Sequence, residues 1–165
     1  MTTTLPVPIA FELPEGWRAT PPDGVGAPGA AFVALYPQPD AGFTANITVD
    51  GSFRPDPATL PEIADESVEH LRASAASVEI IERREVGSAE APGLTQTLAV
   101  AAVAGGAPRD LIQSQVYLSM LDVADPGRRA VIRLILTVTA GQHPAVLEDF
   151  RDFVRTVRPD TGATP

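Results

Sequence analysis

The sequence predicts an α+β fold, an α/β/α sandwich in which a largely antiparallel sheet is flanked by two main helices. Two segments carry apolar residues at helical spacing, whereas several others alternate or run apolar over strand lengths. Clusters of Gly and Pro separate the strand candidates, which favours neighbouring antiparallel strands joined by short turns. The expected order is strands, a helix, a run of consecutive strands and a final helix. We expect one domain over residues 1–160 and a disordered tail at 161–165.

The chain opens with a short apolar run, residues 7–13, that ends in a Pro14-Glu15-Gly16-Trp17 corner. Trp17 is the only tryptophan. A tryptophan at such a corner usually buries its large ring, so we interpret Trp17 as a core anchor. The alternative is an exposed contact for a partner protein.

Strand candidates follow at residues 29–36 and 43–49. The second alternates cleanly and places one set of side chains on a single face: Phe43, Ala45, Ile47 and Val49. Residues 20–28 are rich in Pro and Gly and indicate a surface loop.

The first helix is predicted over residues 59–76. Thr59 and Glu62 have the spacing of a capping box, and Pro61 is tolerated in the first turn of a helix. The apolar stripe consists of Leu60, Ile63, Ala64, Val68, Leu71 and Ala75. The acidic residues Glu62, Asp65, Glu66 and Glu69 occupy the other side. Such a face is usually solvated, and its functional alternative is a docking surface for a basic partner.

Four further strand candidates, at 78–86, 94–103, 111–120 and 132–138, come before a helix predicted at residues 144–157. The turn sequence Asp125-Pro126-Gly127 predicts a hairpin between the last two strands. Several residues make one sheet face partly polar: Thr95, Thr97, Gln113, Gln115 and Tyr117. This polar face is either an exposed binding surface or a wet layer beneath the second helix.

Three segments carry a family resemblance. The opening Phe11-Glu12-Leu13-Pro14-Glu15-Gly16-Trp17, the strand beginning Phe43-Thr44-Ala45-Asn46-Ile47 and the closing run at residues 150–159 resemble the PsbP/Mog-type sandwich proteins, in particular their bacterial LpqN- and DcrB-like branch. The resemblance implies an α/β/α sandwich around an antiparallel sheet. It also implies mostly non-enzymatic roles as accessory subunits, lipoproteins and binding partners.

Composition excludes several classes of function. The chain has 165 residues, a formal net charge of -9 and no cysteine. Such a charge repels phosphate backbones and anionic lipids, so we expect no nucleic-acid partner. We also expect no membrane insertion, because no stretch approaches the ~20 apolar residues of a membrane helix. With no secretory pattern at the N-terminus, the predicted location is cytoplasmic.

Catalytic and metal chemistry have little support in the sequence. The only histidines are His70, expected to be solvated, and His143, expected in a capping or loop role at a helix start. Ser119, His143 and Asp149 can be assembled on paper as a triad, but no Gly-x-Ser-x-Gly elbow positions a serine. We therefore predict no catalytic, cofactor-binding or metal-binding residues.

The sequence thus predicts a non-catalytic accessory or binding protein that recognises a protein partner through its sheet face and acidic surface. Open sheet edges also make a symmetric homodimer a reasonable arrangement. The alternative function is a pocket protein or small enzyme acting on an apolar small molecule.

Overall fold

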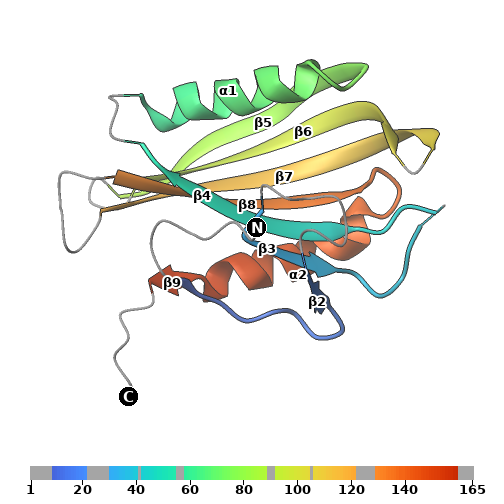
Figure 1. Ribbon diagram of the computed structural model, residues 1–165, viewed down its shortest axis with the longest axis horizontal. Coiled ribbons are helices and arrows are strands. Elements are labelled where there is room, and N and C mark those ends of the chain that lie inside the picture. Colours follow the sequence, from blue (N-terminus) through green and yellow to red (C-terminus); the bar gives the residue numbers. More distant parts are fainter. Residues whose placement is uncertain are drawn as a thin grey trace.

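The computed structural model describes residues 9–21, 30–40, 42–54, 58–88, 92–104, 106–121 and 129–159. A seven-stranded antiparallel sheet in the order β2-β3-β4-β8-β7-β6-β5 forms its centre, with one helix on each face (Figure 1). The strands in that order are β2 (Arg18–Thr20), β3 (Phe32–Leu35), β4 (Asn46–Phe53), β8 (Arg129–Thr139), β7 (Ala107–Leu121), β6 (Pro92–Ala104) and β5 (Ser77–Gly87). A separate two-stranded pair joins β1 (Ile9–Ala10) to β9 (Arg158–Pro159). The predicted sandwich is confirmed, and the predicted tail at 161–165 lies outside the described residues.

Helix α1 (Leu60–Arg72) lies over β5, β6 and β7. Its predicted cap is confirmed, because the backbone N–H of Glu62 donates to Thr59 Oγ1 at 3.3 Å. The predicted end at residue 76 is wrong, since the helix stops at Arg72. The chain then turns into the sheet, where the N–H of Ala76 donates to the carbonyl of Ala101. The sheet therefore takes the N–H of Ala76, which a longer helix would have used itself.

Helix α2 (His143–Thr156) covers the opposite face and differs from its predicted range by one residue at each end. Val146, Phe150 and Phe153 are its buried residues, and they pack in the main core with apolar side chains of β3, β4, β7 and β8. The other core clusters lie on the α1 side. α2 contacts β8 most extensively and leaves the β5 side of its own sheet face without a helix.

The long strands follow the predicted alternation. The hairpin expected across residues 125–127 is confirmed by the β7–β8 pairing, which runs from Leu111↔Thr139 to Leu121↔Arg129. Strand β4 begins three residues later than predicted, at Asn46. Phe43 instead forms an isolated bridge with Asp40, because Gly42, at φ +83°, turns the chain back there.

The opening corner is tied to α2. Trp17 is only 6% exposed, its indole N–H donates to Asp149 Oδ2 at 3.0 Å, and its ring lies 5.2 Å from that of Tyr36. The ring of Phe11 packs edge-on against Phe32 and Phe153. The prediction that Trp17 is a core anchor is confirmed.

Candidate ligand groove

A groove of about 890 Å³ lies on the face of the sheet that carries α2, between that helix and strand β5. It exists because α2 packs mainly against β8, so that strands β6 and β5 have no helix above them on this side. Its floor and walls are made by Ile81, Glu82, Arg84, Val86, Thr95, Gln96, Thr97, Ile112, Ser114, Gln115, Val116, His143, Leu147, Phe150, Arg151, Val154 and Arg155. This volume lies within the roughly 300–1,000 Å³ typical of ligand sites.

Alternation along two paired strands builds the floor. Thr95 pairs with Val116 and Thr97 pairs with Ser114, so these side chains lie side by side on the same face. Their neighbours Leu94 and Leu98 point to the other face, where they pack in the clusters beneath α1. The floor is therefore a mixture of methyl groups and hydroxyls.

Strand β5 forms one wall, and its register breaks between Ile80 and Glu82. This bulge inserts Ile81, which is 56% exposed and lines the groove with Val86. Glu82 and Arg84 form an ion pair of 2.8 Å on this wall. In the sequence, the adjacent residues Ile80 and Ile81 interrupt the strand alternation. This interruption is the signal from which the bulge on this wall could have been predicted.

Helix α2 forms the other wall. Leu147, Phe150 and Val154 supply its apolar surface, and Arg151 and Arg155 stand along its lip. Arg155 is paired with Asp152 at 2.7 Å. Among the residues that the structure describes, the nearest carboxylate oxygen to Arg151 belongs to Glu148 and lies 4.0 Å away.

His143 is the first residue of α2 and lies in the groove, with Nε2 3.5 Å from Ser114 Oγ. The expected capping or loop role is wrong, since His143 lies within the helix, the N-cap is Gln142 and no side chain caps this helix. Burial lowers the pKa of His143, and the charge of Arg151 lowers it further. His143 is therefore a neutral imidazole at pH 7.

The triad considered from the sequence does not form. Ser119 pairs with Val131 and shares its face, which lies beneath α1, whereas His143 is on the opposite side of the sheet. Asp149 is occupied by the indole of Trp17. His70, as expected, is exposed on α1.

The polar residues expected on one sheet face are divided between the two. Thr95 and Thr97 line the groove, whereas Gln113, Gln115 and Tyr117 lie on the α1 side. The interpretation of these residues as a polar layer beneath the second helix is therefore wrong, because the buried polar layer lies beneath the first helix. Sequence alternation gives the two sets of alternating residues within a strand, but it does not say which helix covers which set.

The layer beneath α1 is a continuous hydrogen-bonded network. Gln115 Oε1 accepts from Tyr117 Oη and from Gln96 Nε2, both at 2.7 Å, and Gln115 Nε2 donates to Gln113 at 2.8 Å. Arg83 donates to Gln96 Oε1 at 2.8 and 2.9 Å. Burial raises the pKa of Tyr117, so the phenol stays protonated and can donate.

A second part of this layer centres on Arg133. Its guanidinium makes two bonds to Asp50, of 2.8 and 2.7 Å, and one of 3.0 Å to Ser67 in the middle of α1. Burial acts to lower the pKa of Arg133, but the hydrogen bonds and charge of Asp50 outweigh it and the net shift is upward. Arg133 therefore remains a cation that fixes α1 over the sheet.

The acidic side of α1 is largely engaged within the chain. Asp65 pairs with Arg83 at 2.7 Å, Glu66 with Arg54 at 2.9 Å and Glu69 with Arg72 at 2.8 Å. These pairs reduce the charge that this face offers to a basic partner.

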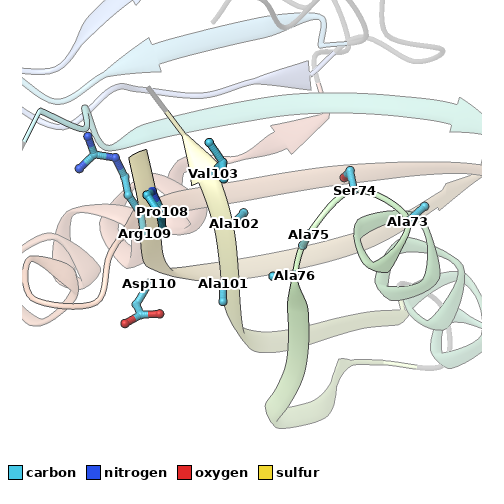
Figure 2. Close-up of a pocket in the computed structure, with 10 residues that line it drawn as sticks. All are labelled: Ala73, Ser74, Ala75, Ala76, Ala101, Ala102, Val103, Pro108, Arg109 and Asp110. Atoms are coloured by element: carbon cyan, nitrogen blue, oxygen red, sulfur yellow. The ribbon is translucent and has the colours of Figure 1, made fainter. Parts of the chain in front are cut away.

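A second hollow, of about 520 Å³, lies where the turn after α1 meets the turn end of the β6–β7 hairpin (Figure 2). Its lining is mostly small: Ala73, Ser74, Ala75, Ala76, Ala101, Ala102, Val103, Pro108, Arg109 and Asp110. Arg109 and Asp110 point to opposite sides of β7 in Figure 2. They do not converge, so this hollow lacks the polar centre of a ligand site.

Across the described ranges, no group of three or more His, Cys, Asp or Glu side chains is placed to hold a metal ion. Neither helix in this part of the chain has the length and apolar character needed to cross a membrane.

Comparison with solved structures identifies the fold. The Mycobacterium tuberculosis protein LpqN, described as involved in cell envelope biogenesis, superimposes with a TM-score of 0.64 over 92% of this chain and 83% of its own, at 13% identity. The Saccharomyces cerevisiae Ran-binding protein Mog1p gives 0.59 over 93% and 92%, at 17% identity. The cyanobacterial PsbP of Synechocystis sp. PCC 6803 gives 0.58 over 92% and 86%, also at 17%.

The fold is that of the PsbP/Mog-type sandwich proteins. The resemblance predicted from the sequence is thereby confirmed, with an LpqN structure among the matches. At these identities the likeness concerns the PsbP/Mog-type fold alone. No family model matches the chain, and no curated protein sequence does.

Proposed function

We propose that this chain is a non-catalytic binding protein that recognises a protein partner through the groove between α2 and β5. The groove itself carries the proposal: a concave surface with a floor of methyl groups and hydroxyls and an apolar helix wall, bordered by charged side chains. Exposed apolar surface of this kind marks interaction sites in soluble proteins.

The geometry of Ser114 and His143 supports a binding role over catalysis. No carboxylate among the described residues orients the imidazole, since Asp149 accepts from Trp17. Ser114 also lies within a strand that is paired on both sides, so the local backbone N–H groups belong to the sheet ladders. They do not form the converging donors that stabilise an oxyanion.

Analogy gives the proposal further support. Mog1p, which shares the PsbP/Mog-type fold, is a Ran-binding protein. A shared fold does not transfer a partner, so the comparison supports only the class of function, which is protein binding.

In-cell photo-crosslinking tests the proposal. A photoreactive phenylalanine analogue replaces Leu147, on the groove wall, or Glu69, on the exposed side of α1. We expect a discrete protein adduct at Leu147. An adduct at Glu69 alone moves the partner surface to the acidic helix, and no protein adduct at either position contradicts a protein-binding role.

The same proposal has three further parts: the acidic surface contributes to partner binding, the protein is cytoplasmic, and it forms a homodimer. A net charge of -9 attracts a partner whose own net charge is positive, whatever the charges of the segment that enters the groove. Light scattering after size exclusion tests the homodimer, and a monomer at high concentration contradicts it. Cell fractionation tests the location.

The volume of the groove supports a second candidate, a site for an apolar small molecule. About 890 Å³ with an apolar helix wall suits a compact hydrophobic ligand. Native mass spectrometry of protein purified from its own cells separates the candidates: a stoichiometric small adduct supports a ligand pocket, and unliganded protein supports the partner site.

A further inference from the structure

We infer that the groove between α2 and β5 receives an amphipathic helix of the partner, with apolar side chains in the groove and acidic residues along the α2 rim, where Arg151 and Arg155 stand. This inference rests on the proposed function, because it specifies the partner chemistry of the same groove. It follows from two independent observations. The backbone groups of the floor strands are already paired within the sheet, and charged side chains line the edges of the groove.

The floor offers side chains and no free backbone. Strands β6 and β7 are each paired on both sides, along β5–β6, β6–β7 and β7–β8. An extended peptide lying on this floor would find no ladder partner for its own N–H and C=O groups. A helix satisfies those groups internally and needs only apolar contact, which Leu147, Val154 and Val116 supply.

Strand addition at the outer edge of β5 is disfavoured by the strand itself. Its register breaks at the bulge near Ile81, and Glu79, Glu82, Arg84 and Glu85 place charges along it. Bulges and charges are the usual devices that prevent edge pairing. The partner segment is therefore expected within the groove and not at the edge.

The lips carry more positive than negative side chains. Among the lining residues, Arg151 and Arg155 stand on the α2 side, whereas Arg84 on the β5 side is paired with Glu82 at 2.8 Å. Arg84 and Arg155 have exposed ion pairs within the chain, which are weak enough to exchange partners. Arg151 has its nearest carboxylate at 4.0 Å and is 59% exposed, so its donors are open to a new acceptor. A partner with carboxylates beside an apolar stripe fits these lips.

Two labelled peptides test the inference. Each is a stapled helix of about 20 residues, long enough to hold its helix, with the same leucine stripe. One carries Glu on both flanks of the stripe and the other carries Lys. Fluorescence anisotropy measures their binding to the full chain at low and high salt.

We expect the Glu-flanked peptide to bind the protein despite its net charge of -9. Arg151→Glu should weaken this binding by at least about fivefold, mainly at low salt. The matched control is Arg72→Glu, an equal charge reversal at an exposed, ion-paired arginine on α1. It should leave the affinity within about twofold, because it lies outside the groove.

Leu147→Asp locates the binding, since it should abolish the Glu-flanked complex. Melting curves confirm that each variant is folded. Equal effects of Arg151→Glu and Arg72→Glu overturn the inference, as does tighter, Leu147-dependent binding of the Lys-flanked peptide. If Leu147 crosslinks a protein in cells but the acidic peptide shows no preference, the inference fails and the proposed function stands. If Leu147 crosslinks nothing, both fail.

Discussion

The two faces of the sheet hold their helices by different physical means. Beneath α2, Val146, Phe150 and Phe153 pack on aliphatic side chains and on the aromatic rings of the opening segment. Beneath α1, apolar clusters flank a buried network of glutamine, tyrosine and arginine. One interface is thus held by apolar burial, and the other also depends on satisfied hydrogen bonds.

Because of this difference, we expect one side of the sheet to matter more for the stability of the protein and the other for the position of its helix. Apolar burial tolerates small shifts of a helix, whereas a hydrogen-bonded network is satisfied in one arrangement only. We therefore expect the α2 side to contribute most of the stability and the α1 side to fix where α1 sits. The groove lies on the α2 side, where the sheet carries apolar surface beyond the reach of the helix.

The largest effect is expected at the centre of the α2 interface. Phe153 is fully buried, and Phe153→Ala should lower the free energy of unfolding by about 3–5 kcal/mol through lost burial and a residual cavity. Urea denaturation measures it. Val103→Ala, at a residue 73% exposed, is the control and should change stability by less than about 0.5 kcal/mol. A loss at Phe153 as small as the control would contradict the comparison.

Trp17 extends the same interface into the opening segment. Trp17→Ala should cost about 3–5 kcal/mol as a truncation of a buried ring. Trp17→Phe keeps an aromatic ring but loses the bond to Asp149, so it should cost less. Thermal unfolding followed by circular dichroism compares them, and an unchanged melting temperature in Trp17→Ala would rule out the anchor.

Removing one hydrogen-bond acceptor from the polar layer beneath α1 should lower the stability of the protein. Gln115→Leu leaves the hydroxyl of Tyr117 and the amide of Gln96 without their shared acceptor, which should cost about 1–3 kcal/mol. Adding Tyr117→Phe removes one orphaned group and should recover part of that loss. Denaturation of both variants tests this, and a double variant less stable than Gln115→Leu would count against the network.

A smaller effect is expected at the ion pair between α1 and β5. Asp65 is largely exposed, so Asp65→Asn should cost at most about 1 kcal/mol and less at high salt. Chemical denaturation at two salt concentrations measures it. A loss as large as that at Gln115 would mean that this pair, and not the buried network, positions α1.

The smallest expected effect is a pH dependence of the free energy of unfolding that comes from His143 in the groove. The pKa of His143 in the folded chain lies below its ordinary value, so the unfolded chain binds the proton more readily. The stability contributed by the neutral imidazole is full above about pH 6.5 and is lost as pH falls toward the folded pKa. His143→Gln should remove this dependence, as unfolding measurements from about pH 7.5 to pH 5 would show. Identical pH profiles would contradict the shift.

Much of the fold could be predicted because its signals are local. The cap at Thr59, the apolar face of α2 and the alternation of β4 each depend on residues close in sequence. The strands β1, β2 and β9 gave no such signal, since two or three residues carry no period. Their pairing depends on partners far away in the chain, as with Ile9 and Pro159.

The candidate site was harder to predict. Thr95 and Thr97 were identified as part of a polar face, but Leu147 and Arg151 gave no sign of lining a groove with them. These residues meet only because β8 lies between β4 and β7 and so draws α2 away from β5.

Local sequence signals were enough to predict the two helices, their apolar faces, the long strands and the acidic character of the chain, because periodicity, capping and charge are properties of neighbouring residues. Which helix covers which set of alternating side chains follows only from how the helices pack on the sheet. This packing places Gln115 in a buried network and Ser114, its neighbour, in an open groove. Adjacent residues in a strand point to opposite faces, and only the packing of the helices gives those faces different environments.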